Sequence, residues 1–454
     1  MRRTATVVGL GISGVGAALL LSQEGWKVRV TDEKDNAQTR EGVRRLAGQG
    51  IQFEIGRHTE DCIRGSRIVV TSPGVRDEAA PLVWARRLGI PVIDEIELGS
   101  RFCPSKIIAL TGTNGKSTTV TLIGELLKDA GQRAVVCGNI GASLCEQVVR
   151  LSKKDIAVLE LSSFQLQRIV KFRPYVSLFL NITQNHFDRH KDFREYLEAK
   201  LNIFKNQQPS DWAVVNYQQR YLCRNVRARL LSFADEAAED GAYCRGGVVY
   251  LARNGRRQAV LDTRELILQG EHNIKNAMAA ILAASVFNVD TASMRNTLRR
   301  FRGLEHRFEF VDEIDGVAFI NDSKATTVDA AMHAIRSVDK PVILIAGGRD
   351  KGSDFTPLRG LVDEKVKTLV LIGEARNKIR TQLMGAAPSY EAKNMEAAVA
   401  VSFDVAKKGD AVLLSPMCAS FDMFKNFEER GEVFKKAVRQ LKKKRVGPQL
   451  CRRQ

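Results

Sequence analysis

Residues 111–118 read TGTNGKST and directly follow the apolar run Ile107–Leu110. The apolar run predicts a buried strand, and the stretch Thr118–Ala130, followed by Gly131, predicts a helix. In a loop between a strand and a helix, glycines let backbone N–H groups point at a phosphate. A lysine and a hydroxyl can then reach the outer phosphates and Mg²⁺. The stretch therefore predicts a phosphate-binding loop that holds ATP.

The spacing of this loop differs from that of the usual P-loop. The usual loop has four residues between its first glycine and the Gly-Lys pair, whereas here only two residues separate Gly112 from Gly115. This shortened form disfavours a motor protein or a GTPase. Ordinary helix capping is the alternative explanation for a Lys-Ser pair at a helix start. The residues that we expect to contact ATP are Gly112, Thr113, Asn114, Gly115, Lys116, Ser117 and Thr118, with Ser117 also a ligand of Mg²⁺.

Two further polar residues follow later strands of the same predicted sheet. Glu160 interrupts the apolar strand Ala157–Leu161, where a charge is costly unless it is paired or bound to a metal. His186 follows the strand Val176–Ile182. A histidine in a loop is more often solvated or hydrogen-bonded than a metal ligand. Glu160 is therefore a candidate second ligand of Mg²⁺, and His186 is a weaker candidate at the same edge of the sheet.

The chain opens with a strand–turn–helix–strand pattern. Residues 5–9 are a β-branched run, residues 9–14 read GLGISG, Val15–Gly25 is helical in pattern, and Val28–Asp32 is the next strand. A G-x-G-x-x-G turn with an acidic residue at the end of the second strand indicates a Rossmann-like nucleotide site. A tight turn without a ligand is the alternative.

The remaining pattern repeats this order of strand and helix. The strand 67–71 runs into the loop Ser72–Gly74, which lies at the same predicted edge of its sheet. Further predicted elements are the helix Asn273–Phe287 and the strands Val342–Ala346, Thr368–Ile372 and Ala411–Ser415. We therefore predict an α/β protein of three domains. These are an N-terminal Rossmann-like domain (1–95), a central P-loop ATPase-like domain (96–303) and a C-terminal Rossmann-like domain with a basic tail (304–454).

The composition is that of a globular chain. Of its 454 residues, 44% are hydrophobic and 27% are charged, which excludes disordered and fibrous proteins. Eight cysteines without a Cys-x-x-Cys pair predict reduced thiols. The formal net charge of +18, part of it in a basic tail, would suit an anionic small substrate, an anionic membrane surface or nucleic acid. No stretch resembles a nucleic-acid-binding module, so we expect phosphate-rich small molecules and no nucleic acid.

Arg2-Arg3 and the uncharged run Thr4–Gln23 also resemble a secretory signal or a membrane span. However, four glycines interrupt the run, and a charged, strand-like segment, Lys27–Val30, follows it. A nucleotide-binding turn explains the run better. We therefore predict a cytoplasmic protein without an integral membrane segment.

Eight stretches of the sequence resemble the motifs of the Mur ligases, in the same order along nearly the whole chain. They are TGTNGKST, ELSSFQL (160–166), NITQNHFDRH (181–190), GEHNIKNAMAA (270–280), LEHRFE (304–309), NDSKATT (321–327), GGRDKGSDF (347–355) and SPMCASFDMFKNFEERG (415–431). Within the family, ELSSFQL, the SKAT string and the last stretch resemble the branch that adds D-glutamate to UDP-N-acetylmuramoyl-L-alanine. A folylpolyglutamate synthase, a sibling Mur ligase and a non-catalytic nucleotide-binding regulator are the alternatives.

The resemblance implies a monomeric cytoplasmic enzyme that binds a UDP sugar, ATP and D-glutamate on its first, second and third domain. ATP would phosphorylate the carboxylate of the L-alanyl sugar nucleotide, and the amine of D-glutamate would attack the resulting acyl phosphate. Two Mg²⁺ ions would assist. Water destroys an acyl phosphate, so a cleft that closes during the reaction is physically reasonable.

The resemblance also assigns roles to individual residues. The catalytic residues would be Lys116, Glu160, His186, Lys200 and Lys324. Glu160, His186 and Lys200, once carbamylated by CO₂, would bind metal together with Ser117. Composition alone favours Lys200 as an exposed helical lysine. Beyond the phosphate loop, Asn276, Arg307 and Asp322 would contact ATP.

The substrate-binding residues are assigned in the same way. For D-glutamate they are Lys324, Thr326, Lys351, Ser420 and Phe427. For the sugar nucleotide they are Gly11, Ile12, Ser13, Asp32, Lys34, Ser72, Gly74, Asn139 and Ser162. Three structural alternatives stay open: Phe427 as plain core, Asp322 and Lys324 as a surface ion pair, and Gly347-Gly348 as a simple turn.

Overall fold

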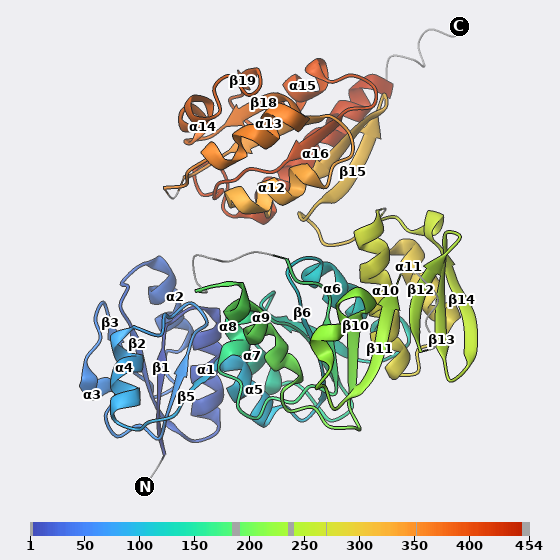
Figure 1. Cartoon of the computed structure of the whole chain (residues 1–454). Helices are drawn as coiled ribbons and strands as arrows, with labels where there is room; N and C mark the ends of the chain where they lie inside the picture. Colours follow the sequence, from blue (N-terminus) through green and yellow to red (C-terminus); the bar gives the residue numbers. More distant parts are fainter. Residues whose placement is uncertain (1–2, 184–190, 235–239, 269, 351, 447–454) are drawn as a thin grey trace, which may run out of the picture. The chain divides into compact units, whose positions relative to one another are not determined.

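The computed structural model describes residues 3–183, 191–234, 240–268, 270–350 and 352–446. The chain divides into two compact units, Met1–Phe301 and Arg302–Gln454, here called the N-terminal and C-terminal units (Figure 1). Each unit is an assembly of parallel strands and covering helices, as the predicted α/β class requires. No helix in the described part of the chain is both long and apolar enough to cross a membrane.

The first sheet of the N-terminal unit has five parallel strands in the order β3-β2-β1-β4-β5. Its strands are β1 (Thr4–Val8), β2 (Lys27–Asp32), β3 (Gln52–Ile55), β4 (Ile68–Thr71) and β5 (Val92–Asp94). Its helices are α1 (Ile12–Gln23), α2 (Ala37–Arg45), α3 (Glu60–Ile63), α4 (Ala80–Arg87) and α5 (Glu95–Phe102). The predicted glycine-rich turn joins β1 to α1. A Cβ atom on Gly14 would lie 1.9 Å from the carbonyl oxygen of Gly9, so only glycine fits there.

The second sheet of this unit has nine strands in the order β14-β13-β12-β11-β10-β9-β6-β8-β7. The strands from β7 to β12 run parallel to one another, and β13 and β14 continue the sheet antiparallel. The strands are β6 (Lys106–Thr111), β7 (Ala134–Gly138), β8 (Ile156–Glu160), β9 (Val176–Phe179), β10 (Trp212–Asn216), β11 (Arg229–Ala234), β12 (Gly241–Arg245), β13 (Val248–Arg253) and β14 (Arg256–Asp262).

The helices of this second layer include three short 3-10 turns. They are α6 (Lys116–Asp129), α7 (Leu144–Val148), α8 (Ser163–Gln167), α9 (Phe193–Leu201), α10 (Glu271–Val286), α11 (Thr291–Arg300), η1 (Asn202–Phe204), η2 (Tyr217–Cys223) and η3 (Thr263–Glu265). The order β6, loop, α6 is the one predicted for the phosphate-binding stretch.

One hydrophobic core connects the two sheets of the N-terminal unit. The same cluster of buried residues contains Val7 and Leu20 from the first layer and Leu144 and Leu159 from the second. Helix α1 packs so closely on the start of α7 that a Cβ atom on Gly16 would lie 2.1 Å from the hydroxyl of Ser143. The first and second sheets are therefore packed together as one body.

The C-terminal unit contains a six-stranded sheet in the order β15-β16-β20-β17-β18-β19, with β15 antiparallel to β16 at one edge. The strands are β15 (Glu309–Ile314), β16 (Val317–Asn321), β17 (Val342–Gly347), β18 (Val366–Ile372), β19 (Ser389–Glu391) and β20 (Ala411–Leu414). The helices are α12 (Val328–Arg336), α13 (Arg359–Lys365), α14 (Arg376–Gln382), α15 (Met395–Val405), α16 (Phe427–Val446) and the 3-10 turn η4 (Thr356–Leu358).

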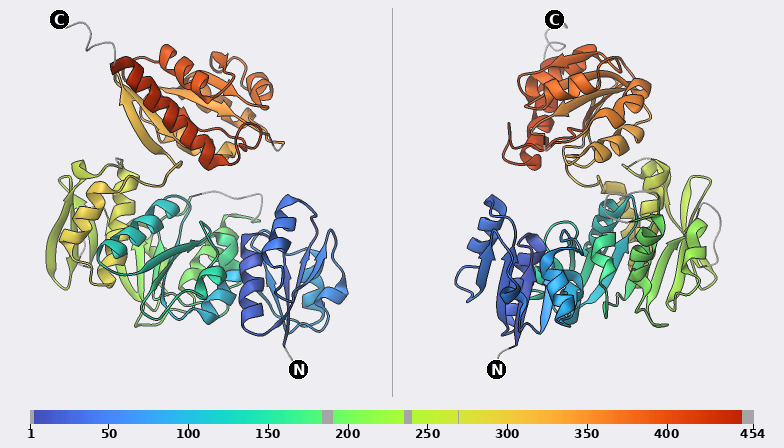
Figure 2. Two further views of the ribbon diagram at one scale, coloured as in Figure 1. Left: turned by 180° about the vertical axis from the view of Figure 1, so that it is seen from behind. Right: turned by 60° about the vertical axis from the view of Figure 1, so that its left-hand side comes forward.

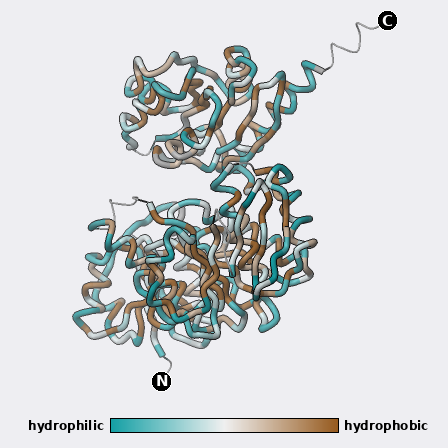
Figure 3. Tube along the Cα trace, turned by 45° about the vertical axis from the view of Figure 1, so that its right-hand side comes forward, coloured by the Kyte–Doolittle hydropathy of each residue, from teal (hydrophilic) through white to brown (hydrophobic). Residues whose placement is uncertain are grey.

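Alternate residues of the central strands face two separate cores in this unit. Leu344 on β17 joins the cluster that α12, α13 and α14 cover, whereas Ile345 joins the cluster under α15 and α16. The further views show helices on both faces of this sheet (Figure 2). Strands that are buried on both faces read as continuous apolar runs, because every side chain meets a core. The hydropathy trace shows these runs as hydrophobic stretches inside each unit (Figure 3).

Most predicted strands and helices are present, with shifted ends. Helix α1 begins at Ile12, not at Val15, because Gly11 already takes the N-cap position. Strand β9 ends at Phe179, although apolar residues continue to Ile182. The reason is that Asn181 leaves the ladder, and its carbonyl oxygen accepts the N–H of Thr113 in the phosphate loop. The antiparallel strands β12–β14 were not predicted.

Two carboxylates at the start of α5 differ in how they are satisfied. Glu97 is fully buried, and its oxygens accept the backbone N–H groups of Val170, Lys171 and Phe172. Glu95 is also buried, but only Oε1 accepts a backbone N–H, from Cys145, while Oε2 has no hydrogen-bond donor among the described residues. Burial raises the pKa of Glu95 to about 7, so its protonated form is favoured in the folded chain.

This burial predicts a pH-dependent stability. Because the folded pKa lies above the unfolded one, the contribution of Glu95 to stability falls as the pH rises from about 4.5 through about 7. Glu95→Gln removes this dependence, which we expect to be on the order of 1–3 kcal/mol. Melting temperatures of both proteins at pH 5 and pH 8 measure it, and the difference between the two pH values should be smaller in the variant. An equal difference in both proteins would contradict the prediction.

Candidate active site

The phosphate loop lies at the carboxyl end of β6 and leads into α6. Gly115 has φ +80°, a left-handed conformation that favours glycine. A Cβ atom at this position would lie only 2.3 Å from Oδ1 of Asn276, so α10 packs directly on the loop. The structure thus places the predicted ATP residue Asn276 beside the loop.

Two lysines converge on one carbonyl group of this loop. The ammonium of Lys116 donates to the carbonyl oxygens of Gly112, at 3.0 Å, and Thr113, at 2.7 Å. The ammonium of Lys200, on α9, donates to the same Gly112 oxygen at 2.8 Å. Lys116 therefore lies folded over the loop, with its charge at the place where the backbone turns.

Lys200 is buried, with 2% of its surface exposed. Burial, together with the nearby charge of Lys116, lowers the pKa of Lys200 to about 6, against a smaller opposing effect of Glu160. The amine is therefore largely uncharged near neutral pH. The alternative of an exposed helical lysine is wrong, because α9 turns this side chain under the loop.

The predicted magnesium ligands Ser117 and Glu160 lie together. The hydroxyl of Ser117 donates to Glu160 Oε2 at 2.5 Å, and the amide of Asn139 donates to Glu160 Oε1 at 2.9 Å. Both partners are neutral and Glu160 is 2% exposed, so these two hydrogen bonds do not by themselves balance a buried carboxylate. Lys200 lies close enough for the two charges to interact. Hard oxygen ligands around such a charge fit Mg²⁺. His186 and Lys351 lie outside the described residues.

Asn181 is a loop-forming residue that the sequence did not reveal. Its Oδ1 accepts the backbone N–H of Asn114 at 2.8 Å and that of Thr113 at 3.1 Å, and its amide donates to the carbonyl oxygen of Asn114 at 3.1 Å. Tyr196 adds a hydrogen bond between its hydroxyl and that of Thr113, at 3.1 Å. A polar residue directly after a buried strand beside the loop was the available signal for Asn181.

The predicted sugar-nucleotide residues lie mainly at the carboxyl edge of the first sheet. Asp32 braces the glycine-rich turn there, because its carboxylate accepts the backbone N–H of Leu10 at 2.7 Å and that of Lys34 at 2.9 Å. Ser72 donates to the carbonyl oxygen of Gly9 at 3.1 Å. Gly11, Ile12 and Ser13 form the cap and first turn of α1, while Lys34 and Gly74 are exposed in loops.

Two members of the same predicted group lie in the second layer. Asn139 follows β7 and is bonded to Glu160, as described above. Ser162 caps α8 directly after β8, with Gln165 completing a capping box. Both therefore lie near the phosphate loop rather than at the edge of the first sheet.

In the C-terminal unit, Asp322 is buried and not part of a surface ion pair. It is 6% exposed and accepts the backbone N–H of Phe308 and the hydroxyl of Ser415, both at 3.1 Å. Burial raises the pKa of Asp322 to about 7. Lys324 is exposed, and its ammonium lies 5.9 Å from the centre of the Phe427 ring. Phe427 is only half-buried, so it is not plain core.

Arg430 joins the segments that carry the predicted D-glutamate residues. It is 1% exposed and donates to the hydroxyl and carbonyl of Ser323, and to the carbonyl of Cys418. Ser420, two residues after Cys418, is buried, whereas Thr326 is exposed. Arg430 was not predicted as a site residue, because a charged residue in a helix pattern is usually solvated.

Three family models match the chain: the Mur ligase MurD-like N-terminal domain over residues 3–94, the Mur ligase middle domain over 110–284 and the Mur ligase glutamate ligase domain over 306–418. The UDP-N-acetylmuramoylalanine–D-glutamate ligase of Thermoanaerobacter pseudethanolicus is 41% identical over 445 residues, which cover 96% of this chain and 98% of that protein. The chain belongs to the Mur ligase family. The predicted family and fold class are therefore confirmed.

Other proteins are similar to this Mur ligase over the same length. The UDP-N-acetylmuramoylalanine–D-glutamate ligase of Geotalea uraniireducens is 43% identical over 440 residues, covering 96% of this chain and 97% of its own. The crystal structure of MurF ligase from Thermotoga maritima in complex with ADP matches with a TM-score of 0.56, covering 97% of this chain and 98% of that one. At 14% identity, this structure supports the fold alone.

The contacts of Asn181 lead to a prediction about ATP binding. In Asn181→Ala, the N–H of Asn114 loses its side-chain acceptor, which costs about 1 kcal/mol and loosens the loop. We expect the KM for ATP to rise roughly five- to tenfold. Phosphate release at varied ATP concentration measures this. Asn202→Ala is the control, because its amide donates to the Leu166 carbonyl outside the loop. An unchanged KM for ATP in Asn181→Ala would contradict the proposal that Asn181 shapes the loop for ATP.

Proposed function

We propose that this Mur ligase joins D-glutamate to the carboxylate of UDP-N-acetylmuramoyl-L-alanine, with conversion of ATP to ADP and phosphate. The observation that carries the proposal is the match over 96% of the chain to relatives with that name. The amide bond forms by way of an acyl phosphate, which D-glutamate attacks through its amine. The product is a precursor of peptidoglycan.

The phosphate loop would hold ATP. Backbone N–H groups of residues 112–118 would face the phosphates, and the Lys116 ammonium would move from its loop carbonyls to the transferring phosphoryl group. The bound ADP named for the MurF structure supports a nucleotide in this fold. Asn276 would contact the nucleotide from α10. Arg307 would contact the γ-phosphate, the group that is transferred, and Asp322 the ribose hydroxyls.

Ser117 and Glu160 would hold Mg²⁺, with His186 and a modified Lys200 as further ligands. A bound Mg²⁺ ion would neutralise charge on the phosphoryl group during transfer. Asn139 orients the Glu160 carboxylate by its hydrogen bond, so both oxygens of this residue have a fixed direction.

Lys200 has the properties of a lysine that reacts with CO₂. The uncharged amine would attack the carbon of CO₂, a nitrogen–carbon bond would form, and one proton would leave to solvent. The resulting carbamate carries a negative charge, which the buried site between Lys116 and a metal ion would stabilise. Its lowered pKa, to about 6, supports this proposal because only the uncharged amine is a nucleophile.

The two other substrates would bind at separate sheet edges. The glycine-rich turn with Asp32 and Ser72 would hold the UDP part, with its diphosphate at the N-terminus of α1. Lys324, Thr326, Lys351, Ser420 and Phe427 would hold D-glutamate, whose two carboxylates need cations and hydroxyls. We further propose domain boundaries near residues 95 and 303, a monomeric state, a cytoplasmic location and no nucleic-acid partner.

The substrate specificity is tested by supplying UDP-N-acetylmuramoyl-L-alanine, ATP and Mg²⁺ with one amino acid at a time. We expect phosphate release to be fastest with D-glutamate, because two carboxylates match the cationic and hydroxyl groups of the C-terminal unit. L-Lysine, meso-diaminopimelate and L-alanine are the comparisons. A faster reaction with any of these three would exclude the proposed specificity.

Carbamylation is tested with Lys200→Ala. We expect turnover to fall by at least 100-fold, because the site loses its anionic ligand, and short carboxylates such as formate or acetate to restore part of it. Lys205→Ala, five residues after Lys200 and exposed, is the matched control with normal turnover. Loss of activity without any rescue by carboxylates would argue against a carbamate at this position.

A further inference from the structure

A strained turn carries Arg307 at the start of the C-terminal unit. His306 has φ +62° and Phe308 has φ +48°, so both neighbours of Arg307 are left-handed residues that are not glycine. Such a conformation is unfavourable for a residue with a side chain, and it persists only where the surroundings impose it. Strain of this kind collects at functional sites, so the contacts that impose it are informative.

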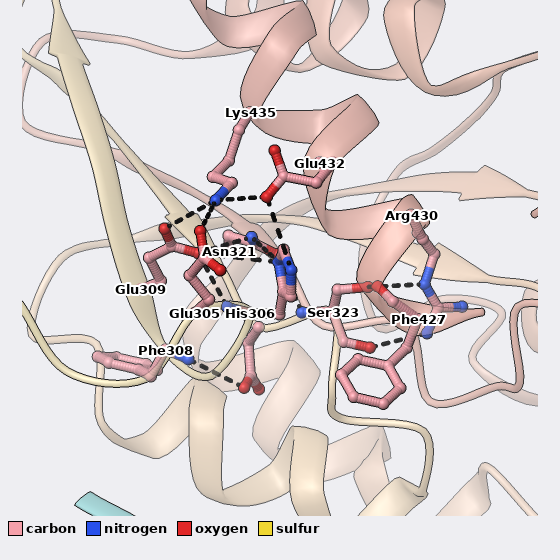
Figure 4. Close-up of polar contacts among 11 residues, drawn as sticks. Glu305, His306, Phe308, Glu309, Asn321, Ser323, Phe427, Arg430, Glu432 and Lys435 are labelled. Atoms are coloured by element: carbon pink, nitrogen blue, oxygen red, sulfur yellow. Dashed lines mark hydrogen bonds and ion pairs between the residues drawn. The ribbon is translucent and has the colours of Figure 1, made fainter. Parts of the chain in front are cut away.

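Buried hydrogen bonds hold His306 in this conformation (Figure 4). Glu309 Oε2 accepts the backbone N–H of His306 at 2.8 Å and the amide of Asn321 at 3.0 Å. The same amide lies 3.0 Å from Nδ1 of His306. The imidazole also needs Gly431 on α16, because a Cβ atom there would lie 2.1 Å from Nδ1. The ring is thus fixed by β15, β16 and α16 together.

Lys435 on α16 anchors this arrangement through three carboxylates. Its ammonium lies 2.6 Å from Glu432, 2.7 Å from Glu305 and 3.3 Å from Glu309, with 5% of the side chain exposed. Burial alone would lower the pKa of Lys435, but hydrogen bonds to Glu305 and Glu432 and the charge of Glu309 raise it. The ligand atoms of Glu305, His306 and Glu432 are close enough to hold a metal ion, but the ammonium already supplies the cation.

The turn is also joined to the segment with the proposed ATP and D-glutamate residues. The carbonyl oxygen of His306 accepts the backbone N–H of Lys324 at 2.9 Å. The backbone N–H of Phe308 donates to Asp322 at 3.1 Å. The residues on both sides of Arg307 are therefore bonded to the segment that includes Asp322 and Lys324, and the backbone direction at Arg307 follows from these bonds.

We infer that Lys435 is a positioning residue for Arg307, acting through Glu309 and the left-handed His306. The inference rests on the proposed role of Arg307 at the transferring phosphate of ATP. A guanidinium that is aimed before the reaction begins stabilises the developing charge without reorganisation. Lys435 touches no substrate in this scheme. It holds Glu309 and the turn from α16, so its loss misdirects the arginine.

A double-mutant cycle separates this role from plain stabilisation. The proteins are the unchanged full-length chain, Lys435→Met, Arg307→Ala and the double variant, and kcat and KM for ATP are measured for each. We expect Lys435→Met to lower kcat at least tenfold, and to have no further effect on kcat when Arg307 is already alanine. Lys436→Met is the matched control, because Lys436 is the next residue of α16 and is exposed.

Two more variants keep the test valid if Lys435→Met does not fold. Lys435→Arg keeps the cation and should recover most of kcat. Should Lys435→Met show no cooperative melting, the cycle is run with Glu309→Gln, which keeps the shape of the side chain.

Each remaining outcome gives a decision. Equal fold-losses from Lys435→Met with and without Arg307, or an unchanged kcat in a folded Lys435→Met, would overturn the inference. Normal turnover in Arg307→Ala would instead overturn the proposed role of Arg307 and leave the ligase assay with D-glutamate as the separate test of function.

Discussion

The hydrogen bond from Ser117 to the buried carboxylate of Glu160 joins the first turn of α6 to the end of β8. The other predicted phosphate and metal residues of the nine-stranded sheet, among those that the structure describes, lie around this pair. Asn139 holds the second oxygen of Glu160, Lys116 and Lys200 meet on the Gly112 carbonyl, and Asn181 shapes the loop between them. A buried negative charge beside two lysines keeps this edge ready for phosphate and a divalent cation, and the lowered pKa of Lys200 is a direct result of the crowding of positive charge and burial.

Local chemistry made part of this site predictable, while contacts between distant segments made the rest unpredictable. The phosphate loop could be predicted because its glycines, lysine and serine are neighbours in the sequence. Glu160 could be predicted because a charge inside an apolar strand is costly unless it has a partner. Asn181 lies 67 residues from the backbone N–H of Asn114 that it accepts, so its place after a buried strand could mark it as a candidate but could not indicate its partner. The left-handed His306 depends on Asn321, Glu309 and Gly431, which only the folded sheet and α16 bring together. The fold class followed from the alternation of strands and helices. Strands β12–β14 were missed, although Gly246-Gly247 and Asn254-Gly255 are two-residue turns of the kind that join the strands of a hairpin.

The two units differ in how their functional edges are built. In the N-terminal unit, the polar groups cluster around a phosphate loop whose main chain is stabilised by neighbouring strands. In the C-terminal unit, long charged side chains from α16 reach back under the sheet edge, as Arg430 does to Ser323 and Lys435 to Glu309. The last helix therefore determines the conformation of residues more than 100 positions earlier in the chain.

The core shared by the first two sheets limits how the protein can be divided. Leu20 and Leu21 of α1 and Leu144 and Val148 of α7 belong to one apolar cluster, with a glycine at the closest approach of the helices. A fragment that begins after β5 would expose the apolar faces of α5 and α7 to water, and such surfaces promote aggregation. The first sheet and its helices are consequently not a detachable module. Insertions, truncations and chimaeras will be tolerated better near Arg302, the first residue of the C-terminal unit, than near residue 95.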